Sequence, residues 1–141
     1  MRITRRFRFY AAHRNPALRD KCARLHGHRY GVELTLEFPQ RSTGGIGMLF
    51  ADIDESVSEV FEALDHRTLL AHDDPLAEMG VIDGAVLLPC ATSAENLAAL
   101  LLRRCLARNP HCVSLALQET DSSLIICSKE DAFSWLDPSI A

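Results

Sequence analysis

The chain has 141 residues, of which 48% are hydrophobic and 24% are charged, and its formal net charge is −4. This composition predicts one domain over residues 1–141 and argues against a membrane protein, because no apolar run approaches the ~20 residues that a spanning helix needs. Five cysteines without a CxxC pair and an N-terminus without the apolar segment of a signal peptide favour reduced thiols in the cytoplasm.

The charge is distributed unevenly along the chain. Residues 1–29 contain nine of the fifteen Lys and Arg residues but one of the nineteen acidic residues. A basic N-terminal region can attract an anionic small molecule. The acidic remainder and the few aromatic residues argue against nucleic acid as a partner.

Residues 3–13 alternate between apolar and polar side chains and predict a first strand. Phe7, Phe9 and His13 would share its buried face. A single histidine at such a place is usually structural, but His13 would become a third imidazole near the next strand if the two strands pair. The polar connection over residues 14–25 is long enough to carry function.

The next segment holds the thiol of Cys22 and the imidazoles of His26 and His28 within seven residues. Both histidines lead into a strand expected over residues 30–38, and alternation places them on the same face as Tyr30. Three histidines with a fourth position open are typical of a catalytic zinc site. The sequence therefore predicts zinc bound near this strand, and two surface histidines in a loop are the alternative.

A turn-rich stretch over residues 40–47 predicts a hairpin or crossover loop. The helix that follows is expected to be capped by Asp52, and its apolar residues recur at helical spacing. It ends near Asp65 and His66, a carboxylate beside an imidazole that can form an acid/base pair. A histidine that meets the helix dipole explains His66 equally well.

Residues 67–88 are expected to form a loop, with a short buried strand over residues 85–88. Thr92 and Glu95 fit a capping box at the start of a second helix. A capping role is the simpler interpretation of Glu95, and a role in the site is the alternative.

The third strand is predicted over residues 112–120, and its leucine face continues to Glu119. Burying a lone carboxylate is costly. Glu119 is therefore either a rim residue or a group that binds a ligand with two adjacent N–H donors. A fourth strand is expected over residues 124–128.

The predicted order of elements is strand, strand, helix, helix, strand, strand. This order favours an α+β fold with a four-stranded antiparallel sheet and two helices packed on one face. The outer strands leave sheet edges that need protection, which favours oligomerisation.

Several motifs together resemble the 6-pyruvoyltetrahydropterin synthase family. They are Phe9-Tyr10-Ala11-Ala12-His13, Cys22-x-x-x-His26-Gly-His28-x-Tyr30, Leu64-Asp65-His66, Ser93-x-Glu95-Asn96 and Glu119-Thr120. The Cys-x-x-x-His-Gly-His spacing is most similar to the bacterial 6-carboxytetrahydropterin synthase branch, which acts in queuosine synthesis. The chain departs from the family pattern at Leu70, where the family often has Asn, and at Thr92-Ser93, where it usually has Pro-Thr.

The resemblance implies the tunnelling fold, in which the sheets of a trimer join into a barrel and two trimers stack into a homohexamer. It also implies a bound Zn2+ and a pterin triphosphate substrate. The residue roles that it implies are metal binding by His13, His26 and His28, catalysis by Cys22, Asp65 and His66, and pterin binding by Glu119.

The implied reaction is that of a carbon–carbon lyase. It converts 7,8-dihydroneopterin triphosphate to 6-carboxy-5,6,7,8-tetrahydropterin and releases acetaldehyde and triphosphate. Cations near Cys22 are expected to make its thiol more acidic, and Arg14, Lys21 or Arg24 is expected to meet the triphosphate. The alternatives are the sister activity, a 6-pyruvoyltetrahydropterin synthase that eliminates triphosphate, and a catalytically silent zinc- or pterin-binding oligomer.

Overall fold

The computed structural model describes residues 1–38 and 44–140, so residues 40–43 of the expected turn-rich loop lie outside the described part. The elements in chain order are β1 (Arg2–His13), the 3₁₀ turn η1 (Lys21–Ala23), β2 (His26–Glu37), α1 (Phe50–Glu62), β3 (Arg67–Ala71), α2 (Pro75–Met79), β4 (Val86–Leu88), α3 (Ala94–Arg108), β5 (Cys112–Thr120), β6 (Ser123–Ser128) and α4 (Lys129–Trp135).

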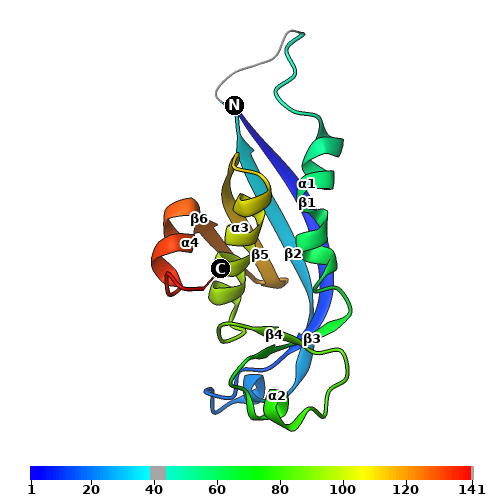
Figure 1. Ribbon diagram of the computed structural model, residues 1–141, viewed down its shortest axis with the longest axis vertical. Coiled ribbons are helices and arrows are strands. Elements are labelled where there is room, and N and C mark those ends of the chain that lie inside the picture. The colour runs from blue at the N-terminus through cyan, green and yellow to red at the C-terminus, as the bar shows by residue number, and fades with distance from the viewer. Residues whose placement is uncertain (39–43, 141) are drawn as a thin grey trace.

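One mixed sheet organises the described residues, with strand order β4-β3-β1-β2-β5-β6 (Figure 1). β1 pairs antiparallel with β2 over its whole length, from Arg2 opposite Glu37 to His13 opposite His26. β5 pairs antiparallel with β2, and β6 with β5. These four strands are the ones that alternation in the sequence predicts.

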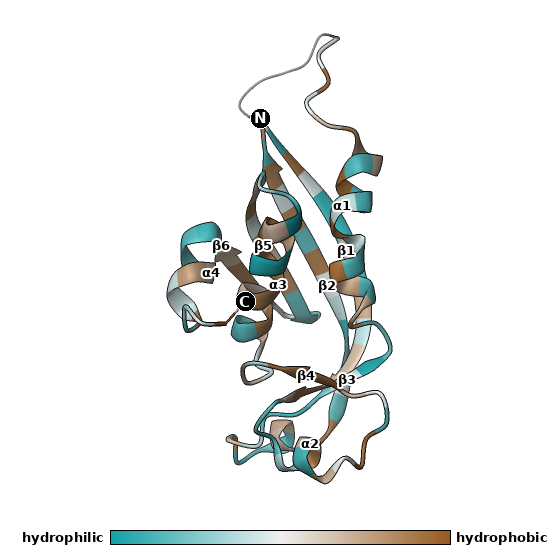
Figure 2. Ribbon diagram, viewed as in Figure 1, coloured by the Kyte–Doolittle hydropathy of each residue, from teal (hydrophilic) through white to brown (hydrophobic). Residues whose placement is uncertain are grey.

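Two further strands make the prediction of a four-stranded sheet wrong. β3 runs parallel to the last residues of β1, Ala11–His13, and β4 runs parallel to β3. Leu69 and Leu70 of β3 are fully buried, and Figure 2 shows both strands as hydrophobic. A strand buried on both faces carries no period-two alternation. Residues 67–71 were therefore expected to be loop, whereas the short strand expected over residues 85–88 is confirmed as β4.

Two helices cover one face of the sheet, as predicted. α1 lies against β1, and α3 lies against β5 and β6 and also contacts α1. Between the layers lies a core that includes the fully buried Phe9, Tyr30, Leu34 and Leu97. Within the described ranges, no helix is both long and apolar enough to cross a bilayer.

The starts of both helices differ from the sequence prediction. α1 begins after Leu49 with no side-chain cap, and Asp52 lies inside its first turn. The N-cap of α3 is Ser93, whose hydroxyl accepts from the backbone N–H of Asn96. The capping box expected from Thr92 and Glu95 is therefore wrong, because the chain enters the helix one residue later.

A short last helix, α4, is attached to α3 through a buried arginine. Arg103 donates to the backbone carbonyl oxygens of Ala132 at 2.7 Å and Leu136 at 2.9 Å. It also donates to the carbonyl oxygens of Asp137 and Ile140 in the segment after α4. The guanidinium therefore satisfies carbonyl groups that the end of a helix leaves without partners.

Candidate metal centre and active site

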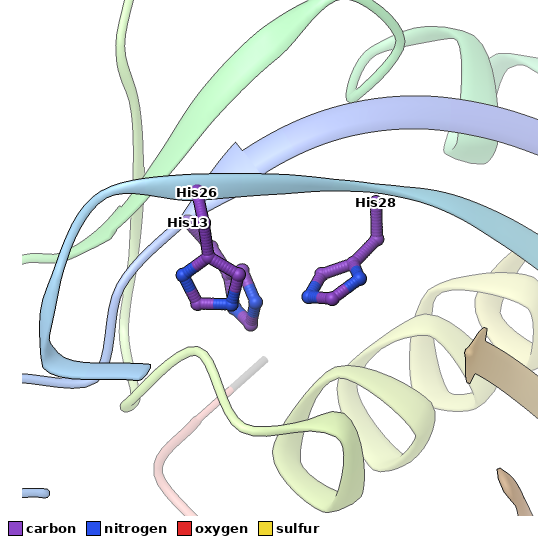
Figure 3. Close-up of side chains that lie close together, drawn as sticks. All are labelled: His13, His26 and His28. Atoms are coloured by element: carbon purple, nitrogen blue, oxygen red, sulfur yellow. The ribbon is translucent and has the colours of Figure 1, made fainter. Parts of the chain in front are cut away.

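The pairing of β1 with β2 brings three histidines together. His13 lies opposite His26 in the ladder, and His28 follows two residues later on the same face of β2. Figure 3 shows the three rings pointing into one space, His26 and His28 from β2 and His13 from β1. One ligand atom of each ring lies within 4.8 Å of the others. The predicted histidine cluster is thus present in the fold.

Backbone carbonyls determine which ring nitrogen of two histidines faces the cluster. Nδ1 of His13 lies 2.8 Å from the carbonyl oxygen of Thr92, and Nδ1 of His26 lies 2.7 Å from that of Arg24. A carbonyl oxygen only accepts, so Nδ1 carries a proton, and in the neutral ring Nε2 is the nitrogen that keeps its lone pair. This tautomer is the one that a histidine ligand commonly adopts when a carbonyl orients it.

The cluster contains buried nitrogens that the described residues leave unsatisfied. Nε2 of His13 and Nε2 of His28 are buried and have no hydrogen-bond partner among those residues. Burial is the main cause that lowers the pKa of both imidazoles, which favours the neutral form that binds metal. A metal ion would satisfy both nitrogens, so the three histidines fit a metal site.

Glu119, at the end of β5, turns its carboxylate toward these histidines. Its Oε1 lies 3.3 Å from Nε2 of His13 and 3.9 Å from Nε2 of His28. The hydroxyl of Tyr30 donates to the same oxygen at 3.3 Å, and burial together with Glu119 raises the pKa of Tyr30, which keeps that hydroxyl protonated. Glu119 is 26% exposed, so it lies at the rim of a pocket and also reaches into it.

That pocket has a volume of about 330 Å³ and also contains Cys22. Its lining includes His13, His26 and Glu119, and Glu95 reaches it from the first turn of α3. Four residues to which the resemblance assigns roles, Cys22, His13, His26 and Glu119, thus line one cavity.

The expected acidity of Cys22 is wrong for the isolated chain. Cys22 lies in η1, where its backbone N–H donates to the Asp20 carboxylate at 2.8 Å. Partial desolvation, followed by the charge of Asp20, raises the pKa of the Cys22 thiol, and the opposing effect of Lys21 is smaller. Desolvation together with Asp20 thus outweighs the effect of Lys21 on the pKa of the Cys22 thiol.

Asp65 and His66 form the predicted pair, but they lie at another cavity. Nδ1 of His66 is 2.8 Å from Oδ2 of Asp65, and Oδ1 of Asp65 accepts from the backbone N–H of Tyr10 at 2.8 Å. His66 has a positive φ of 56° in the turn between α1 and β3. It lines a cavity of about 500 Å³ with Tyr10, Arg29 and His28 of the histidine cluster, whereas Cys22 lines the 330 Å³ pocket.

Two residues that orient groups of the site were not identified from the sequence. Thr92 acts through its backbone carbonyl, which leaves no sequence signal. Tyr30 acts through its hydroxyl, and its place on the face of His26 and His28 could have identified it. Arg14, one of the residues expected to meet triphosphate, instead lies 3.2 Å from the fully buried carboxylate of Asp74.

Comparison with known proteins identifies the family of the chain. The family model described as 6-pyruvoyl tetrahydropterin synthase matches residues 2–130. The chain belongs to this family of lyases. The family match covers β1 to β6 and therefore includes all the residues that form the two cavities.

Curated relatives of the chain carry the name of one branch of the family. A 6-carboxy-5,6,7,8-tetrahydropterin synthase of Rickettsia felis is 35% identical over 57% of this chain, and the match spans only 57% of that relative's length. A probable 6-carboxy-5,6,7,8-tetrahydropterin synthase of Halobacterium salinarum is 31% identical over 82% of this chain and 79% of the relative.

Solved structures share the fold. An uncharacterized protein of Wolinella succinogenes has a TM-score of 0.79 at 21% identity and covers 92% of this chain and 98% of its own. The 6-pyruvoyl tetrahydropterin synthase of Plasmodium falciparum has a TM-score of 0.73 at 19% identity and covers 92% and 97%. At these identities the structures establish the common architecture.

Proposed function

We propose that this chain is a zinc-dependent 6-carboxytetrahydropterin synthase. The reaction would convert 7,8-dihydroneopterin triphosphate to 6-carboxy-5,6,7,8-tetrahydropterin and release acetaldehyde and triphosphate, as a step of queuosine synthesis in the cytoplasm. The observation that carries the proposal is the single pocket shared by His13, His26, Cys22 and Glu119. The names of the Rickettsia and Halobacterium relatives support this branch of the family.

The three histidines would hold zinc, because their donor set suits that ion. Zinc would supply Lewis-acid stabilisation of negative charge on the side chain of the substrate. Glu119 would accept hydrogen bonds from two adjacent N–H groups of the pterin ring, as a carboxylate does in a bidentate contact. Lys21 and Arg24, which flank Cys22, would then be the cations that meet the triphosphate, since Arg14 is engaged by Asp74.

Cys22 would move a proton on the side-chain carbons of the substrate, with His66 as its acid/base partner and Asp65 orienting that imidazole. Because the pKa of the Cys22 thiol is raised, a base close to the thiol is needed to accept its proton. His66 of the same chain lines a different cavity, and its side chain is 78% exposed. We therefore propose that each active site combines Cys22 of one copy with Asp65 and His66 of a second copy.

The free edges of the sheet support such an assembly. Within β1, β3 pairs with Ala11–His13 alone. The rest of that edge of β1 therefore carries no strand among the described residues. At the opposite edge, β6 exposes Leu124 and Ile126. Pairing β6 of one copy with β1 of the next would close a barrel from three sheets. The proposed assembly is a homohexamer of two such trimers.

The test is incubation of the zinc-loaded protein with 7,8-dihydroneopterin triphosphate, followed by mass analysis of the pterin and an acetaldehyde assay. We expect a carboxypterin together with acetaldehyde. Cys22→Ala should abolish this turnover and leave the zinc content unchanged. His72→Ala, which removes an exposed histidine outside the cluster, is the matched control for loss of an imidazole.

Other outcomes assign the chain differently. A pyruvoylpterin without acetaldehyde would identify the sister activity, 6-pyruvoyltetrahydropterin synthase. Binding of zinc and pterin without any conversion would identify a silent binding protein. Full turnover by Cys22→Ala would refute the proposed role of the thiol.

A further inference from the structure

Glu119 lies where a fourth metal ligand would lie. In a tetrahedral site with metal–ligand bonds of about 2.0–2.2 Å, two ligand atoms are separated by about 3.3 Å. Oε1 of Glu119 is 3.3 Å from Nε2 of His13 and 3.9 Å from Nε2 of His28. The carboxylate oxygen thus lies at this separation from Nε2 of His13 and somewhat farther from Nε2 of His28.

An ordinary ion pair explains this contact poorly. The three imidazoles crowd together, with ligand atoms within 4.8 Å, and charging them would set like charges against one another. The geometry between Oε1 of Glu119 and Nε2 of His13 also makes no hydrogen bond, so that buried nitrogen has no partner among the described residues. Oε1 of Glu119 and the lone pairs of two imidazole nitrogens face the same space without a hydrogen bond between them. A metal site has this arrangement when its ion is removed.

The carboxylate is also held in this orientation. The hydroxyl of Tyr30 donates to Oε1 at 3.3 Å, and the Tyr30 ring is fully buried and stacked on Phe9. A hydrogen bond from a rigid neighbour to a ligating oxygen is the usual way in which proteins orient a carboxylate ligand. Tyr30 therefore fixes Glu119 toward the histidines.

We propose that Glu119 is the fourth ligand of the metal ion when no substrate is bound, and that it binds the ion through Oε1. This inference rests on the proposed metal site, and it adds a second role to a residue proposed to bind the pterin ring. The two roles exclude one another in time, because one carboxylate cannot hold both the metal and two ring N–H groups in the same orientation. Small anions could then not bind the metal until a ligand with hydrogen-bond donors displaces the carboxylate from it.

The test uses the protein loaded with Co2+, whose visible absorption reports a change of ligands, and sodium azide as a small anionic probe of an open position. Glu119→Gln and Glu119→Asp are compared with the wild type, because Asp keeps the charge but is one methylene too short to reach the ion. Glu55→Gln, an exposed residue of α1, is the matched control. Melting temperatures establish that the variants are folded.

We expect azide to leave the wild-type and Glu55→Gln spectra unchanged and to shift the spectra of both Glu119 variants. Zinc affinity, measured by competition with a chelator, should fall at least about tenfold in both variants, since even an outer partner of a ligand contributes about 10- to 100-fold. Wild-type protein that takes up azide as readily as Glu119→Asp would overturn the inference. Azide binding to Glu119→Gln alone would also overturn it, because charge and not ligation would then exclude the anion. Wild-type protein that binds neither metal would refute the metal site itself.

Discussion

The imidazole of His13 is tied to Thr92, whose carbonyl oxygen lies 2.8 Å from Nδ1 of the ring. The hydroxyl of Thr92 donates in turn to the carbonyl oxygen of Arg14 at 2.7 Å. Thr92, two residues before α3, thereby contacts both the side chain of His13 and the backbone of Arg14 at the end of β1. This double contact is where the chain departs from the Pro-Thr pattern of its family.

We predict that Thr92→Val weakens metal binding without removing it. Valine keeps the carbonyl group but loses the hydroxyl, so a carbonyl acceptor loses its donor at a cost of about 1–3 kcal/mol. A less firmly held His13 should lower zinc affinity about tenfold. Chelator competition and chemical denaturation measure the two effects. Thr4→Val, an exposed residue of β1, should change neither, and an unchanged zinc affinity in Thr92→Val would contradict the proposed anchoring of His13.

A second prediction concerns the sharing of active sites between copies. Cys22→Ala and His66→Ala should each be inactive, because each removes one proposed proton-transfer group. When the two variants are unfolded and refolded together, some sites receive Cys22 from one chain and His66 from another. Random assembly should restore about a quarter of the wild-type activity. Refolding each variant alone provides the control, and a mixture that stays inactive would show that the two groups come from one chain.

A third prediction follows from the pKa of Asp65. The hydrogen bond from the Tyr10 N–H and then that from His66 lower this pKa. A carboxyl group with a lower pKa in the folded state stabilises the fold above its unfolded pKa, and this contribution is lost as the pH falls through the folded pKa. Asp65→Ala should therefore lower the melting temperature at neutral pH, and the difference from wild type should shrink below about pH 4.

Thermal unfolding followed by circular dichroism between neutral pH and about pH 3 measures this effect. Asp73→Ala, which removes an exposed carboxylate, should show a smaller difference at neutral pH. A difference between Asp65→Ala and wild type that is constant over the whole range would mean that the charge of Asp65 does not stabilise the fold.

A fourth prediction concerns Arg103. Its replacement by methionine keeps an extended apolar side chain but removes every hydrogen bond to the carbonyl groups of α4 and of the segment after it. Hydrogen bonds to charged groups contribute about 1.5–3 kcal/mol each, so the free energy of unfolding should fall by at least that amount. Arg104→Met is the matched control on the next position of α3. Urea denaturation measures the loss, and trypsin should cleave near Lys129 faster in Arg103→Met if α4 loosens as expected.

The strands that carry the proposed metal ligands could be predicted because one of their faces is polar. β1 and β2 alternate residue by residue, and the burial of Phe9, Tyr30 and Leu34 confirms the predicted face. Alternation also places His26 and His28 together without any knowledge of the fold. What it leaves open is register, and the ladder that sets His13 opposite His26 depends on a long connection with no fixed turn geometry.

The missing parts of the prediction have physical reasons of their own. β3 is buried on both faces, so its sequence shows no period, and Leu69 and Leu70 carry no information on which strand they join. The pKa of the Cys22 thiol is raised by desolvation and then by the charge of Asp20, and the basic composition of the segment shows neither effect. The separation of Cys22 from His66 depends on the turn that follows α1, where His66 has a positive φ and lines the other cavity.

The place of His13 in the sheet bears on how such a protein can diverge. It ends a strand that pairs with β2 on one side and with β3 on the other, so its backbone is fixed by two neighbours. Cys22 instead lies in a single 3₁₀ turn of a long connection, where its backbone is held by hydrogen bonds with Asp20 and Asn15. Mutations in that connection can replace the reacting group and leave the ion in place. The proposed metal ligands thus lie on the sheet and the proposed reacting group on a connection, so the connection can change without rebuilding the sheet.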